Sequence, residues 1–131
     1  MTSLMAKPNI FIIDDDEAVR DSLDAYLSLK GMNVTAFSSA QHVLNHEGHA
    51  PELLIMDVNM PDIDGFMLLE MLRHRGNGAP AVFISGLGDG EMRQRAARMG
   101  VAAFFDKPVD PTRLFASLTN LLTKSRNLGI E

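Results

Sequence analysis

Three short segments each contain an apolar run that stops at charged residues. They are residues 13–16 (Ile-Asp-Asp-Asp), 55–57 (Ile-Met-Asp) and 105–108 (Phe-Asp-Lys-Pro). Apolar runs this short, separated by helix-length stretches, are typical of buried parallel strands, and ligands of such sheets bind in the crevice outside the strands' carboxyl ends. Carboxylates gathered there repel one another unless a cation joins them, and oxygen ligands suit a hard ion such as Mg²⁺. We therefore expect a metal-assisted phosphoryl site.

Composition limits what surrounds this site. The chain has 131 residues, 46% of them hydrophobic, which suffices for one core and not for two full domains. We expect residues 8–124 to form one domain, residues 1–7 an N-terminal tail, and residues 125–131 a C-terminal tail or linker stub. The net charge of −5 disfavours direct nucleic-acid binding, because neutralising phosphates requires clustered Lys and Arg.

Cysteine usage and hydropathy indicate the compartment. The chain has no cysteine, which excludes disulfides and thiolate metal sites and fits a reducing compartment. No apolar stretch approaches the roughly 20 residues that span a bilayer, and the first residues lack the apolar core of a signal peptide. We therefore expect a cytoplasmic protein without membrane contact.

Strand-like and helix-like segments alternate along the chain. We expect strands at residues 9–13, 32–37, 53–56, 81–85 and 101–106, and helices at residues 17–30, 39–46, 66–75, 89–99 and 111–124. Each parallel crossover needs a helix, so this alternation predicts an α/β fold with a doubly wound parallel sheet covered on both faces. Five strands and five helices favour the flavodoxin-like order 2-1-3-4-5. Periodicity alone does not establish that order.

The segments that end the expected strands resemble one known family. They are residues 12–16, 56–62 (Met-Asp-Val-Asn-Met-Pro-Asp), 84–86 (Ile-Ser-Gly) and 104–108 (Phe-Phe-Asp-Lys-Pro). In this order, at the ends of the first, third, fourth and fifth strands, they resemble the receiver domain of two-component response regulators over residues 8–124. The resemblance implies a phosphate-operated signalling switch rather than an enzyme that acts on an external metabolite. Its only chemistry would be self-catalysed phosphotransfer and dephosphorylation.

The resemblance also implies roles for the acidic residues. Asp57 corresponds to the phosphoacceptor, which receives a phosphoryl group from a phosphohistidine of a sensor kinase. Asp14 and Asp15 correspond to the acidic pair that holds Mg²⁺, for which Mn²⁺ can substitute. Asp57 would supply a third carboxylate, and the backbone carbonyl of Asn59 a further ligand. A carboxylate fits the acceptor role, because it is nucleophilic at neutral pH once its charge is offset.

Three further residues match moving or reporting parts of the family. Lys107 corresponds to the lysine that reaches a phosphoryl oxygen, and its bond to Pro108 is typically cis in the family. Ser85 corresponds to the hydroxyl residue that moves toward the phosphoryl group. Phe104 corresponds to the switch aromatic, whose movement alters the face made by the fourth helix, fifth strand and fifth helix.

The implied partners are a sensor histidine kinase or phosphotransfer protein, and an output domain or downstream protein. Homodimerisation linked to phosphorylation, through the fourth and fifth helices, is a further implied response. The sequence does not distinguish a single-domain regulator from a fragment of a longer one, and it identifies neither the output nor the cognate kinase.

Several charged residues have two interpretations. Asp16 is either a helix-dipole partner or a solvated charge, and Asp62 and Asp64 are best interpreted as turn residues. Arg93, with Arg95 and Arg98, gives the fourth helix a basic edge that is either partner surface or solvated.

Two alternative functions have sequence evidence against them. An aspartate-dependent phosphatase usually has a second acid two residues after its nucleophile, where this chain has Asn59. A receiver that works without phosphate would lack part of the acidic, hydroxyl and lysine set, and this chain lacks none of it. His46 and His49 are one residue too close for a zinc-protease motif. His42 and His46 have the spacing of one helix face, but no third ligand lies near them in sequence.

Overall fold

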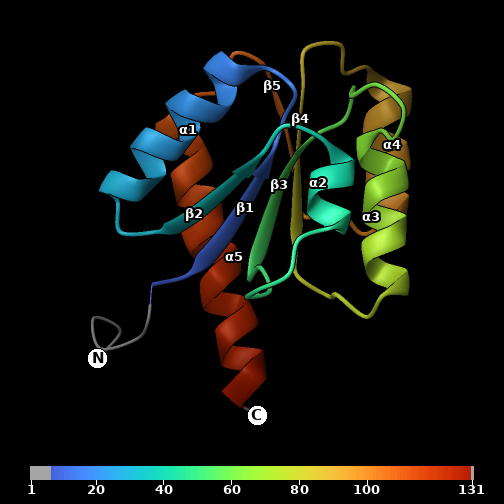
Figure 1. Cartoon of the computed structure of the whole chain (residues 1–131). Coiled ribbons are helices and arrows are strands. Elements are labelled where there is room, and N and C mark those ends of the chain that lie inside the picture. Colours follow the sequence, from blue (N-terminus) through green and yellow to red (C-terminus); the bar gives the residue numbers. More distant parts are fainter. Residues whose placement is uncertain (1–6, 131) are drawn as a thin grey trace.

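The computed structural model describes residues 7–130, and side chains as far as residue 127. Its sheet has five parallel strands in the order β2-β1-β3-β4-β5, which confirms the predicted flavodoxin-like fold (Figure 1). The strands are β1 Asn9–Ile13, β2 Asn33–Phe37, β3 Leu53–Asp57, β4 Ala81–Ser85 and β5 Ala103–Asp106. The helices are α1 Glu17–Leu29, α2 Ala40–Leu44, α3 Gly65–His74, α4 Gly90–Arg98 and α5 Pro111–Ile130.

Each face of the sheet carries its own apolar core. Alternate strand residues such as Phe11 and Phe83 pack under α2, α3 and α4, whereas Ile12 and Ile84 pack under α1 and α5. Figure 1 shows these two layers of helices on opposite sides of the sheet. Strands buried on both faces must be apolar at every position, which explains the continuous hydrophobic runs in the sequence.

Carboxylate side chains cap the N-termini of three helices that follow the strand-end loops. Asp16 accepts hydrogen bonds from the backbone amides of Ala18 and Val19, so it is the N-cap of α1. Asp64, interpreted from the sequence as a turn residue, is instead the N-cap of α3, and Asp89 caps α4 in the same way. These contacts satisfy amides that the first helical turn leaves unpaired. The two interpretations of Asp16 are thereby resolved in favour of the helix end.

The end of the last helix differs from the prediction. α5 continues to Ile130, so residues 125–130, expected as a tail or linker stub, are helical. No Gly or Pro interrupts residues 112–128. In addition, Arg126 makes a two-pronged contact with Glu52, with Nε 3.0 Å from Oε2 and Nη2 3.1 Å from Oε1. This contact ties the extension of α5 to the start of β3.

Other boundaries shift by one or two residues. α2 ends at Leu44 rather than His46, because the amide of His46 bonds back to Val43 as the chain turns. β5 begins at Ala103 rather than Val101. The predicted N-terminal tail, residues 1–7, lies outside the described residues except for Lys7. No helix in the described part of the chain is long and apolar enough to cross a membrane.

Candidate functional site

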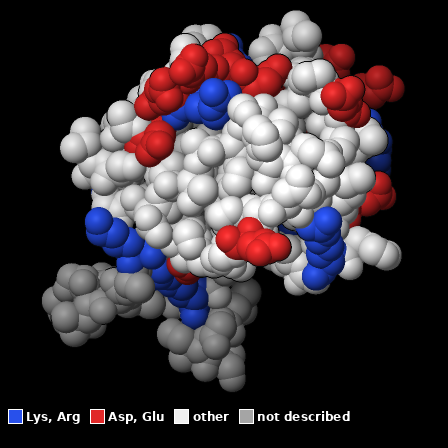
Figure 2. Space-filling model, viewed as in Figure 1, with Lys and Arg blue, Asp and Glu red and all other residues white. Residues whose placement is uncertain are grey.

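Three carboxylates meet at the edge where the strands end. Asp14 and Asp15 follow β1, and Asp57 is the last residue of β3. One oxygen from each lies within 4.8 Å of the others. Asp14 and Asp57 are buried, with 0% and 3% of their surface exposed, whereas Asp15 is exposed. Figure 2 shows that acidic side chains gather along this upper edge of the molecule.

Strand register places the two buried carboxylates side by side. Ile13 of β1 pairs with Met56 of β3, so Asp14 and Asp57, which follow them, lie at the same level along the two strands. Local hydrogen bonds then orient both carboxylates: Oδ1 of Asp14 accepts from the amide of Asp16 at 2.8 Å, and Oδ1 of Asp57 accepts from the amide of Asn59 at 3.2 Å.

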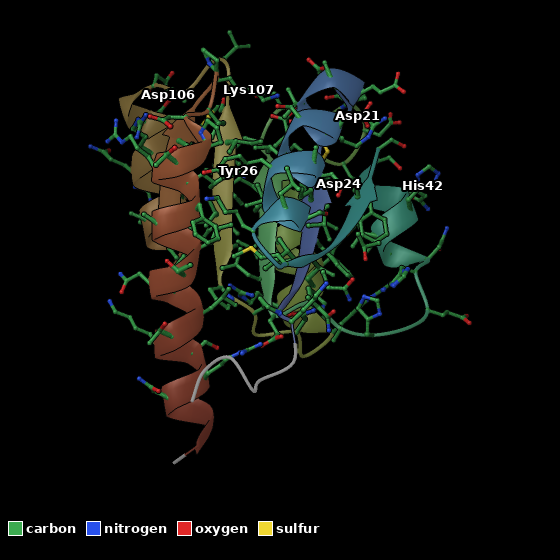
Figure 3. All side chains as sticks on the ribbon, turned by 90° about the vertical axis from the view of Figure 1, so that its left-hand side faces the viewer. Asp21, Asp24, Tyr26, His42, Asp106 and Lys107 are labelled. Atoms are coloured by element: carbon green, nitrogen blue, oxygen red, sulfur yellow. The ribbon has the colours of Figure 1, made fainter. Side chains whose placement is uncertain are left out.

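Lys107 supplies the cation that faces this pair. Its Nζ lies 2.9 Å from Oδ2 of Asp14 and 3.3 Å from Oδ2 of Asp57. Its amide donates to the carbonyl of Ser85, and its peptide bond to Pro108 is cis, as the family resemblance implied. Figure 3 shows Lys107 at the edge where the strands end. One lysine therefore contacts carboxylates from two different strands.

The electrostatics of the site favour added positive charge. Burial, followed by the charge of Asp14, raises the pKa of Asp57 to about 6, although Lys107 and the amide of Asn59 oppose the shift. Burial lowers the pKa of Lys107, but its contacts with the two carboxylates outweigh that effect and raise the pKa overall. One lysine does not fully compensate two buried carboxylates and an exposed neighbour.

The oxygen donors fit a hard divalent cation. Asp14, Asp15 and Asp57 form the one group of three or more His, Cys, Asp or Glu side chains in the described residues that can hold a metal ion. Carboxylate oxygens without nitrogen or sulfur suit Mg²⁺ or Mn²⁺. A cavity of about 420 Å³ opens beside them, lined by Asp15, Asp16, Asp57, Asn59, Gly86, Leu87 and Lys107.

Ser85 is bonded to a side chain that the sequence analysis did not connect with it. Its Oγ accepts from Nδ2 of Asn59 at 2.9 Å and from the amide of Leu87 at 3.1 Å. We expected only the backbone carbonyl of Asn59 to take part in the site. No local pattern predicts the side-chain contact, because the two residues are 26 positions apart and meet only across β3 and β4.

Phe104 is half-buried on β5, at the border of the core. Its ring centroid lies 6.5 Å from that of Phe83, at an angle of 62°. The guanidinium carbon of Arg93 lies 4.6 Å from the centroid of the same ring, and Nη2 of Arg93 lies 2.6 Å from Oδ2 of Asp106. Arg93, interpreted from sequence as partner surface or a solvated edge, therefore contacts β5.

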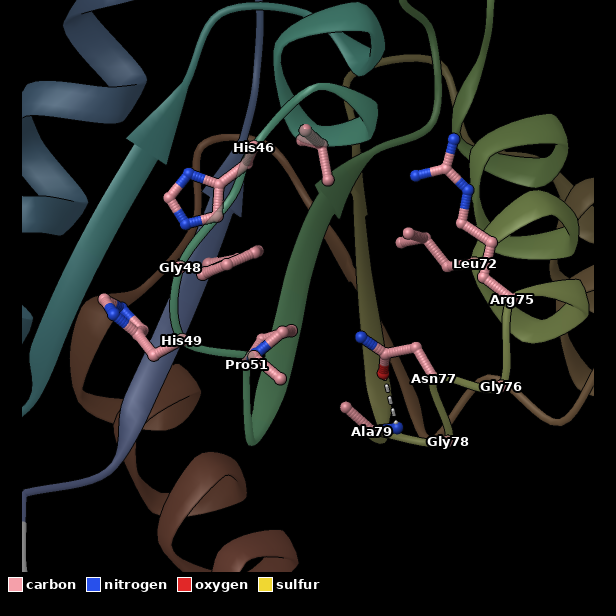
Figure 4. A pocket seen from close by; sticks show the side chains of 13 residues that line it. His46, Gly48, His49, Pro51, Leu72, Arg75, Gly76, Asn77, Gly78 and Ala79 are labelled. Carbon is pink, nitrogen blue, oxygen red and sulfur yellow. Dashed lines mark hydrogen bonds between the residues drawn. The ribbon is translucent and has the colours of Figure 1, made fainter.

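The two histidines noted in the sequence lie at the opposite edge of the sheet. The ring centroids of His46 and His49 are 5.9 Å apart, beside a cavity of about 500 Å³ that Phe11 and Leu72 also line (Figure 4). This cavity shares no lining residue with the acidic site. The histidines therefore play no part in the carboxylate cluster.

The sequence matches a known protein family and several of its members. Residues 10–119 match the response regulator receiver domain. The chain is 32% identical over 123 residues to the transcriptional regulatory protein FixJ of Bradyrhizobium diazoefficiens. The aligned region covers 93% of this chain and 60% of FixJ. It is 38% identical over 114 residues to the response regulator protein TmoT of Ectopseudomonas mendocina, and this aligned region covers 86% of this chain and 52% of TmoT.

Solved structures agree with the sequence relatives. A CheY-like receiver domain protein from Methanospirillum hungatei superposes with a TM-score of 0.85 at 26% identity, over 92% of this chain and 98% of that one. The response regulator StyR superposes with a TM-score of 0.81 at 34% identity, over 93% of this chain and 62% of that one. The chain spans between about half and three fifths of the length of FixJ and TmoT. It belongs to the receiver domain family of two-component response regulators.

Proposed function

We propose that this receiver accepts a phosphoryl group on Asp57 from a phosphohistidine of a sensor histidine kinase or phosphotransfer protein. The supporting observation is the contact of Lys107 with both Asp14 and Asp57, beside an open cavity. Such a site holds a nucleophilic carboxylate next to an ammonium group on a flexible side chain, which can move with the negative charge of the phosphoryl group. The cytoplasm is the compartment that we propose for this exchange.

Phosphotransfer needs positioning and charge compensation more than covalent assistance. A carboxylate oxygen of Asp57 forms the new O–P bond while the N–P bond of the phosphohistidine breaks, and its electron pair remains on the partner's imidazole. Lys107 already contacts Asp57, and after transfer it would contact a phosphoryl oxygen. Hydrolysis of the phosphoryl group on Asp57 would be self-catalysed, without an external substrate.

Asp14, Asp15, Asp57 and the backbone carbonyl of Asn59 are the proposed ligands of Mg²⁺, or of Mn²⁺ in its place. When bound, the ion would offset the negative charge that gathers as a phosphoryl group approaches the carboxylates. Without a cation, the buried carboxylates repel each other, which contributes to the raised pKa of Asp57.

The response is proposed to pass through Ser85 and Phe104. Ser85 would donate its hydroxyl hydrogen to the phosphoryl group, and Phe104 would move with it. The altered surface is the face of α4, β5 and α5, which would control an output domain or a downstream protein. Phosphorylation-linked homodimerisation through this face is one form that the response can take.

Phosphoryl uptake tests the assignment of Asp57. We expect the wild type, with Mg²⁺ and acetyl phosphate, to gain one phosphoryl group by intact-protein mass spectrometry, and Asp57→Asn to gain none. Asp62→Asn is the matched control, because it makes the same chemical change at an exposed turn residue with φ of 68°, a conformation that Asn tolerates. A wild type that gains no mass, or an Asp57→Asn protein that gains as much, would overturn the assignment.

A second variant separates uptake from response. Lys107→Ala is expected to accept the phosphoryl group and to lose much of the spectral change that beryllofluoride, a phosphoryl mimic, causes in the wild type. A full wild-type response in Lys107→Ala would show that the lysine does not couple the phosphoryl group to the switch.

A further inference from the structure

Arg93 of α4 joins two residues on one face of β5. Side chains alternate along a strand, so Phe104 and Asp106 point to the same side of the sheet, toward α4. The guanidinium group of Arg93 covers the Phe104 ring at 4.6 Å and contacts Oδ2 of Asp106 at 2.6 Å. One arginine thereby links the helix, the aromatic residue and the residue that precedes Lys107.

α4 has few apolar contacts that could replace this link. Ala96 is its one buried residue, and Met92 is only partly buried against the core. By contrast, α3 buries Gly65, Phe66, Leu68, Leu69 and Leu72. A helix with so small an apolar face depends more on polar contacts for its position.

The Phe104 ring also occupies space next to the loop after Ser85. A Cβ atom at Gly88 would lie 2.7 Å from Cε1 and 3.0 Å from Cζ of Phe104. The ring can take this position only because residue 88 has no side chain. Movement of the ring therefore involves the loop that follows Ser85, the helix that begins at Gly90, and Arg93.

From these contacts, we infer that Arg93 is a positioning residue that holds Phe104, and with it α4, in the resting arrangement of the switch. The inference rests on the proposed function, in which Ser85 and Phe104 move when Asp57 is phosphorylated. The resting assignment follows from Ser85, whose Oγ is held by the side chain of Asn59. Release of the Phe104 ring from Arg93 is then part of what phosphorylation must bring about.

The expected effect is modest, because the ion pair is partly exposed. The side chains of Arg93 and Asp106 are 42% and 63% exposed. Contacts of this kind, an exposed ion pair with a stacked aromatic ring, shift an equilibrium by roughly threefold to fivefold. By linkage, removing a contact made only in the resting arrangement strengthens the binding of any ligand that favours the other one by the same factor.

The experiment compares Arg93→Ala with wild type by amide NMR during titration with beryllofluoride at saturating Mg²⁺. The wild-type spectra without and with beryllofluoride define a line of chemical shifts for the amides of residues 86–104. We expect ligand-free Arg93→Ala to lie partway along this line, and to reach half-saturation at roughly threefold to fivefold lower beryllofluoride. A purely structural loss would move the resonances off the line.

Arg98→Ala is the matched control. It removes the same charge from the same helix, and Arg98 has no ion pair or ring contact within the described residues. We expect it to titrate as wild type does. Arg93→Lys retains a cation that can reach Asp106 and should restore part of the wild-type affinity, although lysine lacks the planar group that stacks on Phe104.

A double-mutant cycle tests whether Arg93 acts together with Asp106. Asp106→Asn should shift the titration in the same direction as Arg93→Ala, and the double variant should add little to Arg93→Ala alone. Fully additive effects, or a half-saturation of Arg93→Ala equal to that of wild type, would overturn the inference. A wild type that fails to bind beryllofluoride would instead overturn the proposed function, and the positioning role with it.

Discussion

The centre of the sheet and its β5 edge are built in different ways. Every residue of β3 and β4 is buried, whereas β5 has three half-buried residues and one exposed residue. Two carboxylates and a hydroxyl are buried at the ends of the central strands, and Phe104 and Asp106 lie on the edge strand. Dense packing holds reacting groups in place, and sparse packing lets an element rearrange at low free-energy cost.

The ion pairs of the two regions also differ in burial. Lys107 is 21% exposed and contacts Asp14, which is fully buried, whereas Arg93 and Asp106 both face solvent. A buried charge that loses its partner is strongly destabilising, whereas an exposed pair contributes little. The central pair is therefore suited to a site that must keep its geometry, and the edge pair to a contact that can be broken.

Truncating one aromatic residue in each region gives the largest expected difference. Phe83→Ala removes a fully buried ring that packs on Phe66 and should lower the free energy of unfolding by about 3–5 kcal/mol. Phe105→Ala removes a half-buried ring on β5 and should lower it by about half as much or less. Urea unfolding of both variants measures the difference. Equal losses would show that the edge is packed as tightly as the centre.

The pH dependence of stability should reveal the free-energy cost of keeping Asp57 ionised beside Asp14 in the folded protein. Because the pKa of Asp57 is raised from 3.8 to about 6, the folded protein retains a proton that the unfolded chain releases. The free energy of unfolding is therefore higher at low pH, and it falls by about 2–3 kcal/mol as pH rises from about 4 to 6. Asp57→Asn should therefore exceed wild type in stability at pH 7.5, by a margin that shrinks toward pH 4.

Denaturant unfolding in metal-free buffer at several pH values measures this margin. Asp62→Asn, at an exposed position, is the control and should show no such trend. A margin that stayed constant with pH would mean that Asp57 ionises in the folded protein as it does in the unfolded chain.

Mg²⁺ should stabilise the central site by a smaller amount. At a concentration ten times its Kd, the ion is expected to raise the free energy of unfolding by about 1.4 kcal/mol. Asp15→Asn should lose most of this increment, because Asp15 is one of the three carboxylates that meet there. Asp16→Asn should retain it, since Asp16 caps α1. Thermal or urea unfolding with and without Mg²⁺ compares the increments, and equal retention in both variants would argue against Asp15 as a ligand.

Gly88→Ala should have the smallest effect on the free energy of unfolding, but it should clearly change the amide resonances near β5. Its new methyl group meets the Phe104 ring, which can shift because it is only half-buried, so we expect a loss of about 1 kcal/mol. The amide resonances near β5 should move in the same direction as in Arg93→Ala. Gly90→Ala is the control, since nothing lies within 4 Å of its added Cβ. Unchanged resonances in Gly88→Ala would show that the ring does not depend on this space.

Much of the central site could be predicted because it depends on local patterns and on one general property of parallel sheets. Apolar runs that end in charge located Asp14, Asp15, Asp57 and Lys107, and the structure brings all four together. The assignment of individual roles came from resemblance to the receiver family and remains a proposal. The end of α5 was predicted too early, because the contact of Arg126 with Glu52 joins residues 74 positions apart.

The sequence by itself determined the order in which strands and helices follow one another along the chain, and the edge at which the charged residues gather. These features follow from periodicity and from the common direction of parallel strands. Only the tertiary structure decided that Asn59 holds Ser85, that Gly88 makes room for Phe104, and that Arg93 joins that ring to Asp106. Each of these contacts crosses between elements, so its existence depends on side-chain positions that no local pattern specifies.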